Sequence, residues 1–301
     1  MKSVFEDMRS QMYRIYDVEL FFPQGQRIAG SIPDNPVDLY EMAVTKVMRA
    51  HGLTREQIER EDVRYQAEIM KTARFYMEET NQDPALLDKR EEIAELAKGK
   101  MVPTNILRRD ATGLWFPSHS FKAALKENTN ILFAGEKWGN TNKGGISYVA
   151  ERVFVDPSRL YMYRDGEILK NADGVQMRHG TVPNVRTGGM TSIVTQHEYV
   201  EGPFTMRFEL HVLDIKIDVP GVPDGVSPAE ELRDRWPLIM LSMERNGLGS
   251  QRKQSGYGCF KVARFEQRVA TGGFQVSKAK RAASSTPKKV TRLKGDTENV
   301  A

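Results

Sequence analysis

Only one cysteine, Cys259, occurs among the 301 residues, which excludes a disulfide framework and a metal cluster built on cysteines. Long apolar runs are also missing, so no membrane span and no membrane partner are predicted. The first 17 residues carry charges throughout and lack the apolar segment of a secretory signal. The five histidines show no metal-ligand spacing. We therefore expect a cytoplasmic protein with no bound metal and no other cofactor.

A large net charge on the main part of the chain is missing as well. The whole sequence carries +4 at pH 7, but residues 277–301 contain seven cations and two acids. The preceding 276 residues are thus close to neutral. Residues 237–276 nevertheless hold six cations against two acids, so a nucleic-acid role depends on such local patches. The segment 277–301 has few apolar residues and is predicted to be a disordered basic tail.

The first hundred residues contain a strand and then a helical block. Residues 13–22 are rich in aromatic and β-branched types, and predict a strand. Asn35 followed by Pro36 predicts a helix start, and Thr54 with Gln57 forms a capping box. We interpret residues 36–100 as a helical insertion into a sheet fold, because the strand before them has no partner without the strands beyond residue 100.

The remainder of the chain alternates short elements. Residues 118–127 predict a helix capped by Ser118, and residues 174–200 a protruding hairpin. Ser227 with Glu230 forms another capping box, and Pro237 predicts either a kink or a new helix beginning at Trp236. Strands are predicted at 146–155, 159–163, 204–217 and 259–269.

The most specific segment is NGLGSQRKQSGYGCF, residues 246–260. Glycines allow positive φ and close approach of the backbone, and their N–H groups can bind phosphate oxygens. Cations and a tyrosine in such a loop suit phosphates and a stacked base. The candidate RNA contacts here are Gly247, Gly249, Arg252, Lys253 and Tyr257.

Two other phosphate-binding motifs do not fit this loop, and a third interpretation stays open. A dinucleotide fingerprint needs a third glycine where Arg252 stands, and a strand-to-helix turn, whereas this loop comes after a helix. A P-loop needs Gly-Lys-Ser/Thr, which is absent. A glycine-rich turn without a ligand remains the alternative.

The order of a helix, the loop GLGSQRKQSGYG and then a strand resembles the C-terminal glycine-rich loop of the RAMP superfamily. These are the repeat-associated proteins of CRISPR effector complexes. The segment WFPSHSFKAALKE, residues 115–127, is similar to that family's strand–turn–helix. The resemblance implies an α+β, ferredoxin-like (RRM-like) antiparallel sheet over residues 1–276, with the helical insertion and the hairpin as additions.

The same resemblance implies a function. It suggests an RNA-binding backbone subunit that polymerises with copies of itself along guide RNA, joins other effector subunits, and presents the guide for pairing with target nucleic acid. Two alternatives stay open: a RAMP-type ribonuclease, and a phage or mobile-element assembly protein without nucleic acid.

Charge and position indicate further candidate residues. Lys122 and Lys126 lie four apart on the predicted helix 118–127, where they form either a phosphate contact or a solvated face. The remaining candidate cations for RNA are Arg108, Arg109, Arg178 and Arg186, although arginines on a hairpin also serve solubility.

A catalytic role has only weak candidates. His119, beside a helix start, has the chemistry of a general acid or base, but a capping or surface histidine is the simpler interpretation. Asp110, in a loop before the matched strand, suits metal-assisted RNA cleavage, yet it has no aligned partners. The sequence therefore favours a binding protein over an enzyme.

Overall fold

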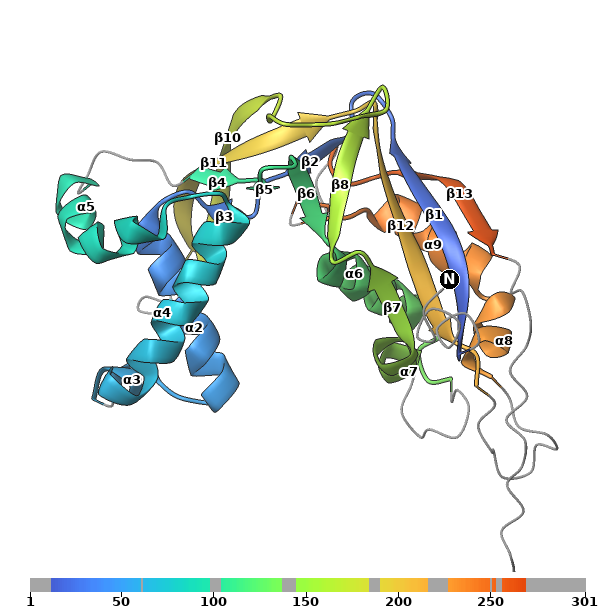
Figure 1. Cartoon of the computed structure of the whole chain (residues 1–301), viewed down its shortest axis with the longest axis horizontal. Helices are drawn as coiled ribbons and strands as arrows, with labels where there is room; N and C mark the ends of the chain where they lie inside the picture. Colours follow the sequence, from blue (N-terminus) through green and yellow to red (C-terminus); the bar gives the residue numbers. More distant parts are fainter. Residues whose placement is uncertain are drawn as a thin grey trace, which may run out of the picture.

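The computed structural model of the chain describes residues 12–60, 62–97, 104–136, 145–183, 190–215, 227–249, 251–252 and 256–268. Helices and two largely antiparallel sheets make it a mixed α+β structure, as the sequence predicts. Figure 1 shows the larger sheet and its helices on the right, a block of helices on the left, and the second sheet between them at the top.

The larger sheet has eight strands, and all its pairs are antiparallel. Alternate residues of its central strand are buried, the pattern of a strand with one face on a core. Along the sheet its strands are β13 (Lys261–Gln267), β1 (Tyr13–Phe22), β12 (Phe204–Leu213), β8 (Arg159–Arg164), β6 (Leu114–Pro117) and β5 (Arg108–Arg109), with β7 (Val153–Asp156) on β12 and β9 (Glu167–Ile168) on β8.

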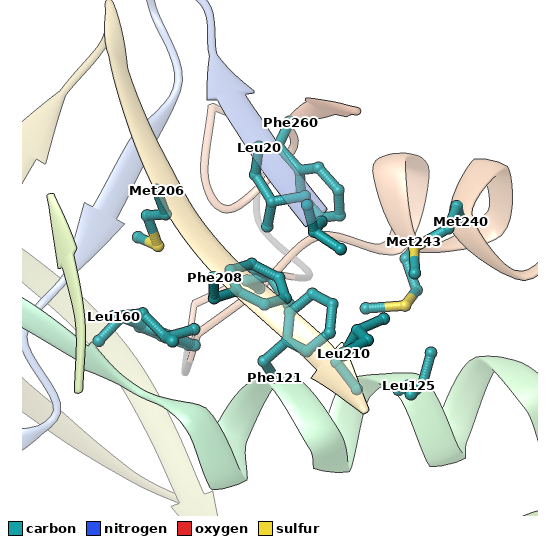
Figure 2. Close-up of a cluster of buried hydrophobic side chains, with 14 of the residues drawn as sticks. Leu20, Phe121, Leu125, Leu160, Met206, Phe208, Leu210, Met240, Met243 and Phe260 are labelled. Carbon is teal, nitrogen blue, oxygen red and sulfur yellow. The ribbon is translucent and has the colours of Figure 1, made fainter. Parts of the chain in front are cut away.

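Four helices cover one face of this sheet: α6 (Ser118–Leu132), α7 (Gly145–Arg152), α8 (Pro228–Arg233) and α9 (Trp236–Asn246). Figure 2 shows Phe121 of α6 pointing toward Phe208 of β12, with Met243 of α9 beside them. The two aromatic rings lie 4.6 Å apart, edge to face, a favoured geometry. This core fixes α6 and α9, and with them the loop at the end of α9.

The smaller sheet has five strands: β10 (Gly174–Pro183), β11 (Met190–Glu201), β4 (Thr104–Ile106), β3 (Ile32–Pro33) and β2 (Arg27–Ala29). β10 and β11 pair as a long antiparallel hairpin, and β4 lies parallel to β11. Between β3 and β4 the chain forms the helical block, which buries its own apolar cluster around Leu39 and Ile69. The block comprises α2 (Pro36–His51), α3 (Arg55–Arg60), α4 (Asp62–Glu79), a 3-10 helix (Pro84–Lys89) and α5 (Arg90–Ala97).

Most of the predicted helix boundaries are confirmed. The Asn35 side chain accepts a hydrogen bond from Val37 N at 2.8 Å, and Gly52 ends α2 with φ +65°. Both capping boxes form. Pro237 begins no kink, because a new helix starts at Trp236 and leaves the proline in its first turn.

Two local predictions were wrong. Residues 146–155 are not one strand, because α7 occupies Gly145–Arg152 and only β7 is extended. The buried pair Tyr148 and Val149 packs on the main core, so tertiary packing overrides local β-propensity. Ser118 is not the cap of α6, since Pro117 holds that position and makes no side-chain cap. The predicted tail over residues 277–301 lies outside the described residues. Within them, no helix has the length and apolar character needed to span a membrane.

Candidate nucleic-acid interface

The two ends of the glycine-rich loop lie against each other. Leu248 N donates to Gly258 O at 2.9 Å. A Cβ on Gly258 would lie 2.2 Å from Leu248 O, and one on Gly247 would lie 2.7 Å from the carbonyl carbon of Gly258. Both glycines also have positive φ. Their first role is therefore to let two backbone segments touch. Gly249, at φ +88°, differs, because a Cβ there would come no nearer than 3.8 Å to the side chains around it.

Beside Gly249 lies a cavity of about 230 Å³, which we call the glycine-loop cavity. Its walls come from the loop after α9, the start of α6, β2 and β5. Its wall combines arginines, serine hydroxyls and apolar surface, the mixture that suits an anionic, partly aromatic ligand. The lining residues are Ala29, Ser31, Leu107, Arg108, Trp115, Phe116, Pro117, Ser120, Ala123, Gly249 and Arg252.

The start of α6 contributes to the same cavity. Pro117 and Ser120 line it, and no side chain caps the helix. Ser118 N donates to Ser158 O at 3.0 Å, but the first turn of any helix leaves further N–H groups without intrahelical partners. Together with the helix dipole, these groups favour an anion at this end of α6.

Both arginines of the cavity are paired with carboxylates. Arg252 forms an ion pair with Glu127 of α6. Arg108 pairs with the buried Glu79 at 3.1 Å and donates to Ser31 Oγ at 3.3 Å. A carboxylate of the protein thus neutralises each of the two cavity arginines. A phosphate that enters the cavity must compete with Glu79 and Glu127 for the guanidinium groups.

The two candidate lysines of α6 do not line this cavity. The Lys122 ammonium lies 4.8 Å from the centre of the Phe154 ring in β7. Burial, and then the neighbouring Lys126, lower the pKa of Lys122. The structure therefore does not place Lys122 and Lys126 in the cavity wall, and their role as phosphate contacts stays a prediction.

Tyr257 requires a correction. The sequence predicts that its ring stacks on a base from an exposed loop, but only 3% of the residue is exposed. The Arg178 guanidinium covers the ring, 3.8 Å from its centre, and the hydroxyl donates to Gln176. Tyr257 is buried because Gln176 and Arg178 of the hairpin pack against it. Arg178 likewise commits its guanidinium face to this ring.

Two other candidates are held by internal partners. Arg109 pairs with Glu198. Asp110 accepts hydrogen bonds from Tyr161 Oη at 2.8 Å, Thr112 N at 2.8 Å and Gly113 N at 3.1 Å, and pairs with Arg159. Burial by itself would raise the pKa of Asp110, but the hydrogen bonds from Tyr161, Gly113 and Arg159 hold it below its usual value. These contacts give Asp110 a structural role.

His119 lies on the first turn of α6, exposed to solvent. The partial loss of hydration around its ring, and then the charge of Arg108, lower its pKa. Lys253 and Arg186 lie outside the described residues.

Three cations of the basic excess in residues 237–276 pair with acids outside the loop. Lys261 pairs with Glu244, while Arg264 and Arg268 pair with Asp17 on the sheet face away from the helices. On that face, cross-strand register sets four acids side by side: Asp156, Glu209, Asp17 and Glu266. This open face is therefore a poor surface for phosphates.

One group on the open face has the donors of a cation site. Ligand atoms of Asp156, Glu209 and His211 lie within 4.8 Å of one another, the one such group in the described part of the chain. Glu209 is already paired with Arg268 and, at 2.8 Å, with His211. The group lies apart from the glycine-loop cavity.

Sequence reasoning missed several residues that shape the site. Nothing in the local sequence around Arg27 signals that this residue meets the glycine loop. Glu79 and Glu127, which neutralise the cavity arginines, are distant from them in sequence. Long-range ion pairs of this kind leave no periodic pattern.

Comparisons with known proteins do not assign this chain to a family. No protein-family model matches the chain, and no curated protein matches it. Among solved structures it is similar to a chain described as "Cryo-EM structure of the Type III-B Cmr-beta bound to cognate target RNA", at 13% sequence identity and a TM-score of 0.38. The match covers 89% of this chain and 64% of that one. The likeness is distant and assigns neither a fold family nor an activity.

Proposed function

We propose that this chain is an RNA-binding subunit of the RAMP type, which coats a guide RNA without cleaving it. The observation that carries the proposal is the glycine-loop cavity. There the uncapped start of α6, the open backbone at Gly249, and the guanidinium groups of Arg108 and Arg252 meet in one concave place. Backbone amides and arginines of this kind suit a sugar–phosphate chain.

The order of elements supports the family part of the proposal. In the larger sheet β13 lies beside β1, β1 beside β12, and β12 beside β7 and β8. α6 comes after β1 in the chain, α9 precedes β13, and the two helices contact each other on one face. This is the order expected for a ferredoxin-like β-α-β-β-α-β unit. In this assignment residues 36–100 are an insertion and residues 174–200 a hairpin added to a domain of residues 1–276.

The charge distribution favours the cavity over the open sheet face as the RNA surface. The four acids in register on the open face repel phosphates, although Arg207, Arg264 and Arg268 offset part of their charge. Bound RNA accordingly runs along the side of the molecule that carries the glycine loop and the hairpin. Copies of the chain then line up head to tail along the guide, together with other effector subunits, and leave the bases of the guide available for a target.

The test is binding of a fluorescent single-stranded RNA to the full chain across a range of salt concentrations. We expect tight binding at low salt. An Arg252→Ala/Lys253→Ala variant is expected to bind at least about tenfold more weakly, with a salt slope smaller by about one for each phosphate that is no longer neutralised.

Arg207→Ala is the matched control, because Arg207 is also an ion-paired arginine, held by Glu19 at 3.3 Å, but on the open face. It is expected to bind RNA as the unmodified chain does. No binding by the unmodified chain, or equal losses in both variants, would contradict the proposal. Shortened RNA products that appear with the unmodified chain and disappear with His119→Ala would favour the ribonuclease alternative.

A further inference from the structure

The hairpin presents two faces with different roles. Val175 and Met177 on one face of β10 are about half exposed, at 55% and 52%. The alternate residues, Gln176 and Arg178, point the other way and contact residues of the glycine-rich loop. Because side chains alternate along a strand, one short stretch of β10 is committed to holding this loop.

The contacts hold the loop at two separate points. Near its beginning, Arg178 Nη1 donates to Gln251 Oε1 at 3.3 Å. Near its end, the buried Tyr257 donates its hydroxyl to Gln176 Oε1 and carries the Arg178 guanidinium on its ring. The same two β10 side chains thus fix both residue 251 and residue 257.

β2 fastens the end of the loop from its other side. Arg27 N donates to Gly256 O at 2.9 Å, and Gly258 N donates to Arg27 O at 2.8 Å. The Arg27 side chain donates to Glu201 at 2.7 Å and to Gln176 at 3.1 Å. Gln176 therefore accepts from both Arg27 and Tyr257, and it links the hairpin, β2 and the loop.

We infer that Gln176, Arg178 and Tyr257 are positioning residues that couple the hairpin to the glycine-rich loop, so that the two grip one RNA strand as a unit. The inference rests on the proposed function. None of the three needs to contact RNA, since Tyr257 is buried and Arg178 is stacked on it. Their effect is to hold residues 251 and 257 at fixed points, while Gly249, just before residue 251, and Arg252, just after it, line the cavity.

The test uses the full chain with Tyr257→Phe, Gln176→Met and the double variant. Tyr257→Phe removes one hydroxyl and keeps the ring under Arg178. Tyr163→Phe, a tyrosine on β8 away from the junction, is the matched control. Two quantities are measured: hydrogen exchange of the loop amides in the absence of RNA, and affinity for a single-stranded RNA of about 30 nucleotides.

Each single variant is expected to speed exchange in the loop several-fold. Tyr257→Phe should weaken RNA binding by about 2- to 10-fold, the effect of one hydrogen bond, and Gln176→Met by at least as much, because it also removes the acceptor of Arg27 Nη1. The double variant is expected to resemble Gln176→Met, because that substitution already removes the bond to Tyr257 together with the bond to Arg27. Exchange in α6 and β12 should stay unchanged, which separates positioning from general destabilisation.

The outcomes distinguish the two claims. If the unmodified chain binds RNA and both single variants bind within twofold of it, the inference is overturned while the proposed function stands. Unchanged exchange in the loop also overturns the inference. An unmodified chain that binds no RNA overturns the proposed function, and this inference with it.

Discussion

At the scale of single residues, the glycines of the loop have different tasks although the sequence presents them alike. Gly247 and Gly258 are confined by backbone atoms, whereas Gly249 borders open space. All three have positive φ, which costs a residue with a side chain roughly 1–2 kcal/mol. Substitution separates the structural glycines from the one that faces the cavity.

Gly258→Ala is expected to destabilise the chain by about 1–3 kcal/mol more than Gly249→Ala, because its new methyl overlaps Leu248 O. Gly249→Ala is expected to cost little beyond the strain of its φ, but to weaken RNA binding, since its methyl stands at the edge of the cavity. Urea unfolding and RNA titration of both variants measure the two effects. A Gly249→Ala variant with unchanged RNA affinity would argue against close backbone approach there.

Asp110 shows how a candidate catalytic group becomes a structural one. Its carboxylate accepts from two backbone N–H groups and a tyrosine, and pairs with Arg159. These partners keep its pKa lower in the folded chain than in the unfolded chain. The resulting stabilisation is complete above the unfolded pKa of about 3.9 and is lost as the pH falls through the folded value.

Asp110→Asn is therefore expected to lower the free energy of unfolding at pH 7 by about 1.5 kcal/mol or more, the value of hydrogen bonds to a charged group. The difference from the unmodified chain should begin to shrink below about pH 3.9, where the carboxylate of the unfolded chain takes up a proton, and continue to shrink as the pH falls through the lower pKa of the folded chain. Chemical unfolding at pH 7 and pH 3.5 measures this, with the exposed Asp88→Asn as control. Equal stability of Asp110→Asn and the unmodified chain at pH 7 would show that the carboxylate contributes no such stabilisation.

At the scale of elements, the sequence predicts the helices and strands whose stabilising contacts lie within a few residues of one another. Asn35, Thr54 and Ser227 begin helices because their side chains satisfy N–H groups a few residues away. The strand predicted over residues 204–217 is confirmed over Phe204–Leu213, which form β12, because its period of two is visible in the sequence. The sequence misassigns α7, whose helical state depends on its packing with α6.

The candidate site is less predictable for the same reason. The glycine-rich loop can be recognised from its own residues, but its surroundings come from far along the chain. Glu127 neutralises Arg252, and Gln176 holds Tyr257. Only the folded chain brings these partners together, so the sequence predicts an exposed aromatic ring where the structure buries one.

The cap of α8 offers a test at this scale. Ser227 is buried, accepts from Glu230 N at 3.1 Å, and donates its hydroxyl to Asp214. Ser227→Ala is expected to cost about 1–2 kcal/mol, because it removes a capping box and leaves the Asp214 carboxylate without this donor. Thr54→Ala, in an exposed box at α3, should cost less, and thermal unfolding compares the two. A smaller loss at Ser227 than at Thr54 would contradict this account of the cap.

At the scale of the whole molecule, two surfaces differ in the charges that they carry. The open face of the larger sheet carries acids in register and the arginines that pair with them. The second surface carries the glycine-loop cavity and the uncapped start of α6. The β10–β11 hairpin, which contacts the glycine-rich loop there, can be followed in Figure 1. Under the proposed function RNA binds at the second surface, where a phosphate competes for the paired arginines, and is repelled by the acids of the first.

The most direct measurement is ultraviolet crosslinking of the full chain to single-stranded RNA, with the crosslinked peptides identified by mass spectrometry. The account predicts crosslinks in residues 247–258 and in residues 105–123, which frame the cavity, and few in β1, β12 or β13. Crosslinks concentrated on those three strands, or a chain that forms none above background, would contradict it.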